Sequence, residues 1–278
     1  MSNPPDLPPL DLKGLLRAHD IHPKKSLGQN FLVSEAALTR VVDAADISKD
    51  DEVLEIGAGL GGLTRHLAQK AGRVVGVELD GRLIPILQDV LSEYDHVELL
   101  HRDILGISME EIFTEPGYLV VSNIPYYITS AIMRHLMESQ IRPGRMVLTV
   151  QKEVAERICA GPGDMSLLAL SVQIFGDPSI RARIPAGAFF PAPKVDSGVV
   201  RVDLHAEPLA DRATIDQVFR LAHAGFSQKR KTLRNSLSSG LGWPKDQTER
   251  LCREAGIDPG RRAETLSIEE WIDLAGTF

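Results

Sequence analysis

One glycine-rich stretch decides the fold of this chain: Leu54-Glu55-Ile56-Gly57-Ala58-Gly59-Leu60-Gly61-Gly62. Its apolar start predicts a buried strand that ends at Gly57, and the amphipathic segment after it predicts a helix. Glycines in such a turn let the backbone approach a ligand closely. The next β-rich run ends at Glu78, twenty-one positions after Gly57, where a carboxylate can accept both hydroxyls of a ribose. The stretch therefore predicts a nucleoside cofactor.

Two classes of enzyme share this glycine pattern. Gly57, Gly59 and Gly62 have the spacing of dinucleotide-binding turns, whereas Gly57, Gly59 and Gly61 have the spacing seen in methyltransferases. The pattern alone leaves a nicotinamide-dependent oxidoreductase open beside a methyltransferase. A purely structural interpretation is also open, with a tight turn and a solvated Glu78.

Five β-rich runs alternate with amphipathic segments along the chain: Glu52–Gly57, Arg73–Glu78, Val97–His101, Tyr118–Asn123 and Arg145–Gln151. Their Val, Ile and Leu content predicts strands that are buried on both faces, which is typical of a parallel sheet with helices on each side. We therefore expect a Rossmann-like α/β fold. Ser179–Ile184 and Gly198–Leu204 read as extended segments that can add antiparallel strands at the edge of the sheet.

The pattern changes at His205, after which no strand signal remains. Helices are predicted over Asp211–Ala224, Lys229–Ser238, Pro244–Ala255 and Ser267–Ala275, and the last begins with a capping box of Ser267 and Glu270. We expect a sheet domain over residues 22–204 and an all-helical domain over residues 205–278. Residues 1–21, with their proline-rich opening, are expected to form a flexible tail.

The composition of the 278 residues is that of a globular protein, with 43% hydrophobic and 25% charged residues. No apolar run approaches the roughly 18 residues of a membrane span, and no signal peptide is recognisable. We therefore expect a cytoplasmic protein without a membrane partner. The two cysteines, Cys159 and Cys252, lie far apart without a partner motif, which argues against a disulfide, a metal site and redox chemistry.

Charge is distributed unevenly along the sequence. The net charge of −7 argues against binding of nucleic acid by the whole surface. Between Phe219 and Asn235, however, five basic residues occur without any acid: Arg220, Lys229, Arg230, Lys231 and Arg234. This run predicts either a local patch for nucleic acid or a solvated helix face.

The segment Ser122–Tyr127 delivers an amide, a proline and two aromatic rings to the end of a buried strand. An exocyclic amine of a nucleobase is a poor nucleophile, because its lone pair is delocalised into the ring. Acceptors such as the Asn123 amide oxygen and the carbonyls around Pro125 can hold its hydrogens so that the lone pair is freed, while Tyr126 stacks on the base. Neither a metal nor a strong base is required. The alternative is a turn with two core tyrosines.

Five segments in this order carry a resemblance to a known family: Lys25–Leu32, the glycine turn, Asn123–Tyr126, Phe189–Ser197 and Phe226–Leu233. Over residues 22–237 the chain resembles the small-subunit (16S) ribosomal RNA adenine dimethyltransferases of the bacterial KsgA type. The resemblance implies a class I methyltransferase sheet with a helical C-terminal domain. It also implies S-adenosylmethionine as the methyl donor.

The resemblance further implies roles for single residues. The cofactor would be held by Asn30 and Leu32 from an N-terminal segment that folds over it, and by Gly57, Gly59, Glu78, Asp103 and Asn123. Asp103 follows the third strand, where it can accept a hydrogen bond from the cofactor's adenine. The reacting adenine would meet Asn123 and Pro125 and lie between Tyr126 and Phe189. Tyr127 stands where a smaller or more polar residue is common.

For the substrate, the resemblance implies two adjacent adenosines near the 3′ end of the small-subunit RNA. Each would be methylated twice, within a partly assembled 30S particle and by a monomeric enzyme. Lys229, Arg230, Lys231 and Arg234 would contact RNA phosphates. Two alternatives stay open: a large-subunit adenine methyltransferase of the antibiotic-resistance type, and a ribosome assembly factor in which catalysis is secondary.

Overall fold

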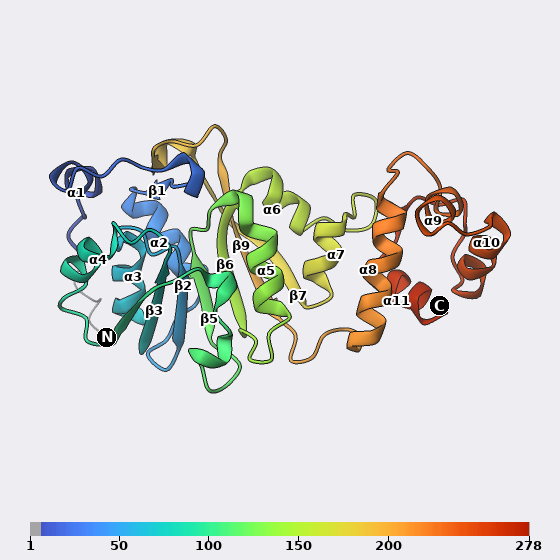
Figure 1. Ribbon diagram of the computed structural model, residues 1–278, viewed down its shortest axis with the longest axis horizontal. Helices are drawn as coiled ribbons and strands as arrows, with labels where there is room; N and C mark the ends of the chain where they lie inside the picture. Colours follow the sequence, from blue (N-terminus) through green and yellow to red (C-terminus); the bar gives the residue numbers. More distant parts are fainter. Residues whose placement is uncertain (1–6, 278) are drawn as a thin grey trace. The chain divides into compact units, whose positions relative to one another are not determined.

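The computed structural model describes residues 7–277, and these form two compact units (Figure 1). The first unit runs to Ala155 and resumes over Ser179–Leu204, while the second consists of Glu156–Pro178 and the chain from His205 onward. We expected a single boundary near residue 205, but the segment Glu156–Pro178 already belongs to the second unit. Backbone hydrogen bonds explain this excursion, because Gly163 N–H donates to the carbonyl of Glu264 and Leu209 N–H to that of Ile174.

The centre of the first unit is a seven-stranded sheet (Figure 1). Its order is β4 (Val97–His101), β3 (Arg73–Glu78), β2 (Glu52–Ile56), β5 (Leu119–Ser122), β6 (Arg145–Gln151), β9 (Ser197–Leu204) and β7 (Gly176–Ile184). The strands from β4 to β6 pair in parallel, and β9 pairs with β6 antiparallel. The Rossmann-like sheet predicted from the sequence is confirmed, and so is an antiparallel strand beyond β6.

Helices of the first unit follow the strands, as expected from their apolar stripes. They are α2 (Glu35–Asp43), α3 (Gly62–Lys70), α4 (Ile84–Val90), α5 (Thr129–Met137) and the start of α6 (Lys152–Ile158). The buried side chains of α5 recur at helical spacing over Ile132, Met133, Leu136 and Met137. Successive residues such as Val74 and Val75 in β3 have no exposed surface, which shows that the sheet is covered on both faces.

The N-terminal region differs from the tail expected over residues 1–21. Leu12–Ala18 form helix α1, whose Leu12 and Leu16 are buried in a cluster with Leu60 and Ile86. The Asp11 carboxylate caps this helix by accepting from Gly14 N–H at 2.8 Å. Two apolar residues at helical spacing are thus enough to dock the segment. The expectation for residues 1–6 lies outside the described residues.

A second, two-stranded sheet joins distant parts of the first unit. β1 (Phe31–Leu32) pairs antiparallel with β8 (Phe189–Phe190), so that Phe31 lies opposite Phe190 and Leu32 opposite Phe189. Two of the five segments that carry the family resemblance are therefore hydrogen-bonded to each other.

The second unit is helical, as the sequence predicts. It contains α7 (Leu167–Gln173), α8 (Arg212–Phe226), α9 (Leu233–Leu241), α10 (Lys245–Glu254) and α11 (Ile268–Gly276). The Trp271 side chain has no exposed surface and packs against Phe226, and the Ser267–Glu270 capping box is present. The helix expected from Lys229 begins only at Leu233, because the carbonyl of Thr232 receives the first helical hydrogen bonds. Lys229 to Lys231 therefore lie in a loop.

Short 3-10 helices complete the chain: Lys25–Leu27, Ile104–Gly106, Met109–Glu111, η4 (Tyr126–Ile128), Ala186–Ala188 and Ala263–Thr265. Within residues 7–277, every helix is too short or too polar to cross a lipid bilayer.

Candidate active site

A cavity opens at the carboxyl ends of the parallel strands, where ligands of such sheets bind. It is lined by residues 27–31, 77–79, 102–104 and 123–128, together with Ile56, Gly57 and Gly59. The residues before position 32 come from the N-terminal segment, and the others follow β2, β3, β4 and β5. All of these belong to the first unit.

The glycine turn and Glu78 form one hydrogen-bonded corner of the cavity. Gly57, Gly59 and Gly61 have φ values of 79°, 62° and 81°, a left-handed conformation that other residues adopt rarely. The Gly59 N–H donates to one carboxylate oxygen of Glu78 at 2.8 Å, and the Asp80 N–H donates to the other at 2.8 Å. Burial nevertheless raises the pKa of Glu78. The carboxylate is fixed in place with lone pairs left for a ligand.

Asn123 follows directly after β5 and is held by the N-terminal segment. Its Nδ2 donates to the backbone carbonyl of Asn30 at 2.9 Å, which leaves Oδ1 as the acceptor of this amide. Asn30 in turn donates from its side chain to the carbonyl of Gly28 at 3.1 Å. Before Asn123, the Ser122 hydroxyl accepts from Ile56 N–H at 2.7 Å and ties the ends of β5 and β2 together.

Tyr126 lies in η4, immediately after Pro125, and its ring lines the cavity. Its hydroxyl lies 2.7 Å from the Ser197 hydroxyl, and Ser197 is fully buried as the first residue of β9. Burial raises the pKa of the Tyr126 phenol, so the group stays neutral at ordinary pH. The hydrogen bond holds the hydroxyl end of the Tyr126 side chain in place at the cavity.

Phe189 and Leu32 depart from the predicted site. Phe189 is only 3% exposed, packs in a hydrophobic cluster with Leu32 and Val199, and is not among the residues that line the main cavity. Pairing of β1 with β8 turns both side chains into the core. Leu32 borders only a small neighbouring pocket, beside Gly57 and Asn123. The role predicted for Phe189, opposite Tyr126 on the target base, therefore stays a prediction.

Asp103 lies at the cavity as the sequence predicts. It follows β4, and its carboxylate accepts from Leu105 N–H at 3.0 Å as the cap of the 3-10 helix after it. In sum, the cavity gathers eight of the ten predicted cofactor and catalytic residues: Asn30, Gly57, Gly59, Glu78, Asp103, Asn123, Pro125 and Tyr126.

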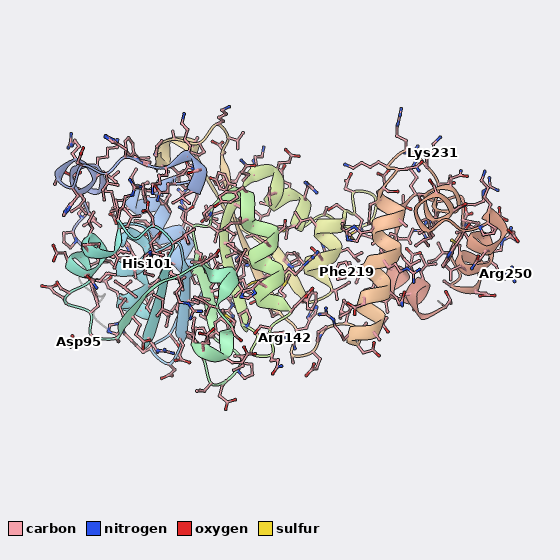
Figure 2. All side chains as sticks on the ribbon, in the orientation of Figure 1. Asp95, His101, Arg142, Phe219, Lys231 and Arg250 are labelled. Carbon is pink, nitrogen blue, oxygen red and sulfur yellow. The ribbon has the colours of Figure 1, made fainter. Side chains whose placement is uncertain are left out.

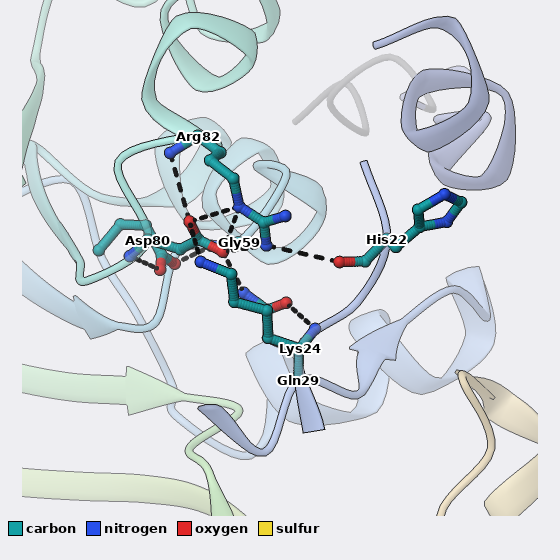
Figure 3. Close-up of polar contacts among 7 residues, drawn as sticks. His22, Lys24, Gln29, Gly59, Asp80 and Arg82 are labelled. Carbon is teal, nitrogen blue, oxygen red and sulfur yellow. Dashed lines mark hydrogen bonds and ion pairs between the residues drawn. The ribbon is translucent and has the colours of Figure 1, made fainter. Parts of the chain in front are cut away.

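An ion-pair network that the sequence did not predict fastens the N-terminal segment to Asp80, close to Gly59 (Figure 3). Asp80 is 4% exposed and accepts from the Arg82 guanidinium, with a shortest distance of 2.6 Å, and from Gln29 Nε2 at 2.9 Å. Lys24 Nζ lies 3.7 Å from the same carboxylate, and Lys24 N–H donates to Gln29 Oε1 at 2.7 Å. The Arg82 guanidinium holds the pKa of Asp80 far below its ordinary value.

Glu55 is a second acid that the sequence analysis gave no role. It lies within β2, is 1% exposed and borders the small pocket next to the glycine turn. Its Oε2 atom has no hydrogen-bond partner within residues 7–277, and burial raises the pKa of the carboxyl to about 8. The signal was an acid between the apolar residues Leu54 and Ile56 of the strand.

Comparison with known proteins agrees with this geometry. The family model described as ribosomal RNA adenine dimethylase matches residues 21–278. The chain belongs to this family.

Relatives of the chain support the assignment. A Dehalococcoides mccartyi protein named ribosomal RNA small subunit methyltransferase A is 45% identical, over 94% of this chain and 90% of its own length. A protein of the same name from Alkaliphilus metalliredigens is 39% identical, over 96% and 95%. Among solved structures, a dimethyladenosine transferase from Plasmodium falciparum aligns with a TM-score of 0.76 at 25% identity, over 88% of this chain and 95% of that chain. The 23S rRNA methyltransferase ErmE aligns with a TM-score of 0.71 at 28% identity, over 89% and 99%.

In this dimethylase, the predicted basic residues lie in the second unit. Lys229, Arg230 and Lys231 are exposed in the loop between α8 and α9, and Lys231 projects from the surface (Figure 2). Arg234 is also exposed but is paired with Glu249 of α10 at 2.7 Å. The cluster therefore consists of three residues in a loop and one that is held by an acid.

Within residues 7–277 there is no group of three or more His, Cys, Asp or Glu side chains that could hold a metal ion. Both cysteines are unpaired, and burial raises the pKa of each thiol, to about 11 for Cys252, which disfavours the reactive thiolate.

Proposed function

We propose that this dimethylase transfers methyl groups from S-adenosylmethionine to N6 of two adjacent adenosines near the 3′ end of small-subunit ribosomal RNA. The product would be N6,N6-dimethyladenosine. The proposal rests on the position of Asn123. This residue follows β5 and lines the cavity beside Pro125 and Tyr126, and its amide is held by the backbone carbonyl of Asn30.

The residues around the cavity suit this cofactor. Glu78 is fixed by two backbone N–H groups and keeps lone pairs for the hydroxyls of a ribose, and Asp103 can accept from an adenine amine. The buried carboxyl of Glu55 can bind an amino group such as that of a methionine portion, because a cation beside it would lower its pKa and favour the ionised form. The left-handed glycines let the backbone come close to such a ligand.

The chemistry follows from positioning. S-adenosylmethionine, when bound, supplies a methyl group on a positively charged sulfur. Asn123 Oδ1 and the carbonyls around Pro125 accept the hydrogens of the adenine amine and so direct its lone pair toward that methyl group. Tyr126 holds the plane of the base through stacking, and Ser197 anchors the hydroxyl end of its side chain.

The substrate is proposed from the relatives and from the charge distribution. Relatives at 39–45% identity carry the name small subunit methyltransferase, and the exposed loop of Lys229 to Lys231 suits RNA phosphates. We propose that the enzyme acts in the cytoplasm, as a monomer, on a partly assembled 30S particle whose RNA is presented as a hairpin.

A second candidate is methylation of large-subunit RNA. Similarity to the 23S enzyme ErmE over 99% of that chain supports it, although its 28% identity is lower than the 39–45% of the relatives named small subunit methyltransferase. Mapping the modified nucleotide decides between the two candidates.

The test uses the purified protein, labelled S-adenosylmethionine and ribosomal subunits from a strain without this modification. We expect N6,N6-dimethyladenosine in the small subunit only. Label in the large subunit supports the second candidate, and no label in either subunit refutes both. A further arm asks whether Asn123→Ala protein restores subunit assembly in that strain, since restoration would mean that assembly does not depend on catalysis.

A further inference from the structure

Tyr127 presents an exposed aromatic ring at the cavity. The residue is 61% exposed, more than any other large hydrophobic residue within residues 7–277, and it lines the cavity beside Asn123 and Tyr126. Single exposed hydrophobic residues are common on protein surfaces and need no explanation by themselves. An exposed ring on the wall of a ligand cavity is different, because a ligand can cover it.

The side chains of the two adjacent tyrosines, Tyr126 and Tyr127, point in different directions. They belong to η4, and in a 3-10 helix with about three residues per turn, neighbouring side chains point roughly 120° apart. The Tyr126 hydroxyl bonds to Ser197 at 2.7 Å, whereas the Tyr127 ring lies against Gly28 of the N-terminal segment. Tyr127 therefore cannot share the role of Tyr126 on the same base.

The Tyr127 ring is supported along one side. A Cβ atom at position 28 would lie 3.2 Å from Cδ1 and Cε1 of Tyr127 and 3.2 Å from Cβ of Pro125, so these groups converge closely. Gly28 has a φ of 61°, where a side chain would also be strained. A glycine at this position leaves room for the ring, which rests on the backbone while most of its surface stays open.

We propose that Tyr127 stacks on the base that neighbours the target adenine, and so forms a second base-binding position beside the cavity. The inference rests on the proposed function and extends it. A target base must leave its stack to enter the cavity, and this exposes a face of the next base. Aromatic side chains commonly take over such lost stacking in RNA recognition.

The position of Tyr127 beside the cavity suits the nucleotide next to the target adenine better than a nucleotide farther along the RNA. A single phosphodiester joins the two nucleotides, so the neighbouring base stays near the mouth where Tyr127 lies. In a substrate with two adjacent adenosines, this neighbour is the second adenine. Tyr127 would then hold one adenine while Asn123 and Tyr126 hold the other.

The test combines a protein change with an RNA change. The RNA is a synthetic hairpin with two adjacent adenosines, in which either one is replaced by an abasic nucleotide. We expect Tyr127→Ala to raise the KM for the intact hairpin about tenfold, within the range for loss of one stacked base. An abasic nucleotide in place of the neighbouring adenosine should raise the KM of the wild-type enzyme by a similar factor. It should not raise the KM of Tyr127→Ala any further, because both changes remove the same contact.

Matched variants separate stacking from bulk. Tyr127→Phe keeps the ring and should behave as wild type, whereas Tyr127→Leu keeps apolar bulk without a π face and should resemble Tyr127→Ala. The affinity for S-adenosylhomocysteine, measured by calorimetry, should be the same in all four proteins. Near-equal melting temperatures exclude misfolding as the cause.

Several outcomes would overturn the inference. Additive effects of Tyr127→Ala and the abasic neighbour would place the ring elsewhere in the complex. A loss confined to cofactor affinity would assign Tyr127 to the cofactor. If the wild-type enzyme methylates the hairpin and Tyr127→Ala does so equally well, only this inference fails. If the wild-type enzyme leaves both hairpin and small subunits unmethylated, the proposed function fails with it.

Discussion

The cavity and the loop between α8 and α9 differ in the sign and the burial of their charged residues. Around the cavity, Glu55, Glu78 and Asp80 are buried acids whose pKa values are shifted by burial or by a paired guanidinium. In the loop, Lys229 to Lys231 are exposed bases. Burial makes a charge sensitive to pH and to each of its partners, whereas exposure makes it sensitive to salt. Single substitutions should therefore have large, specific effects at the cavity and small, additive effects in the loop.

The largest effect is expected for Asn123→Ala. The substitution removes the acceptor for the adenine amine, and loss of one such positioned group lowers kcat by roughly two to three orders of magnitude. Labelled methyl transfer at saturating RNA measures it. Asn235→Ala in α9, which loses only a bond to Thr232, is the matched control and should keep a wild-type kcat. A kcat within threefold of wild type for Asn123→Ala would contradict the proposed role.

Glu55 should make stability depend on pH. Its pKa is about 8 in the folded protein against an ordinary value of 4.5, so the folded state keeps a proton that the unfolded state has lost. The stabilisation that this proton gives to the folded state is complete below pH 4.5 and is lost as pH rises through 8. The free energy of unfolding should fall by a few kcal/mol over this window, since each pKa unit corresponds to about 1.4 kcal/mol.

Denaturant titrations from pH 5 to pH 9 test this pH dependence. Glu55→Gln should flatten the pH dependence of the cofactor-free protein, whereas the exposed Glu93→Gln should run parallel to wild type. Equal slopes for Glu55→Gln and wild type would show that the buried acid is already ionised.

Much of the fold could be predicted from the sequence, because buried strands are apolar over their whole length. β3, β4 and β6 have the predicted bounds, and the cavity lies where the glycine turn and Ser122–Tyr127 indicated. The burial of Phe189 could not be predicted from the sequence, because Phe189 and Phe190 are chemically identical. Only the pairing with β1 decides which ring faces the core.

The ion-pair network around Asp80 escaped prediction for another reason. Its partner Gln29 is fifty-one positions away, and neither residue stands out by its local pattern. Helix α1 was missed because two leucines at helical spacing are a weak signal beside a proline-rich opening. Contacts between distant, individually ordinary residues are the part of this site that no local pattern contains.

Asp80→Asn should weaken the cofactor site. The change removes the charge that binds Arg82, Lys24 and Gln29, and so loosens the segment that carries Asn30 over the cavity. A hydrogen bond to a charged group contributes about 1.5–3 kcal/mol. The dissociation constant for S-adenosylhomocysteine should therefore rise about tenfold. Calorimetry measures it, with the exposed Asp89→Asn in α4 as the control. An unchanged constant would mean that the segment is held by its other contacts.

The smallest effects are expected in the loop. Each of Lys229→Ala, Arg230→Ala and Lys231→Ala should weaken RNA binding a few fold and lower the slope of log affinity against log salt by about 1. Lys49→Ala is the control, because Lys49 precedes β2 and so lies at the amino ends of the strands, opposite the cavity.

Arg234→Ala sharpens the same comparison within the second unit. Its guanidinium is paired with Glu249 at 2.7 Å, so an RNA phosphate would have to compete with a carboxylate that is already in place. We therefore expect a salt slope close to that of wild type and a small loss of stability, since exposed ion pairs contribute about 0–1 kcal/mol. If Arg234→Ala instead lowers the slope as much as Lys231→Ala does, the arginine leaves Glu249 when RNA binds. The double variant with Glu249→Gln would then bind RNA no better than Arg234→Ala alone.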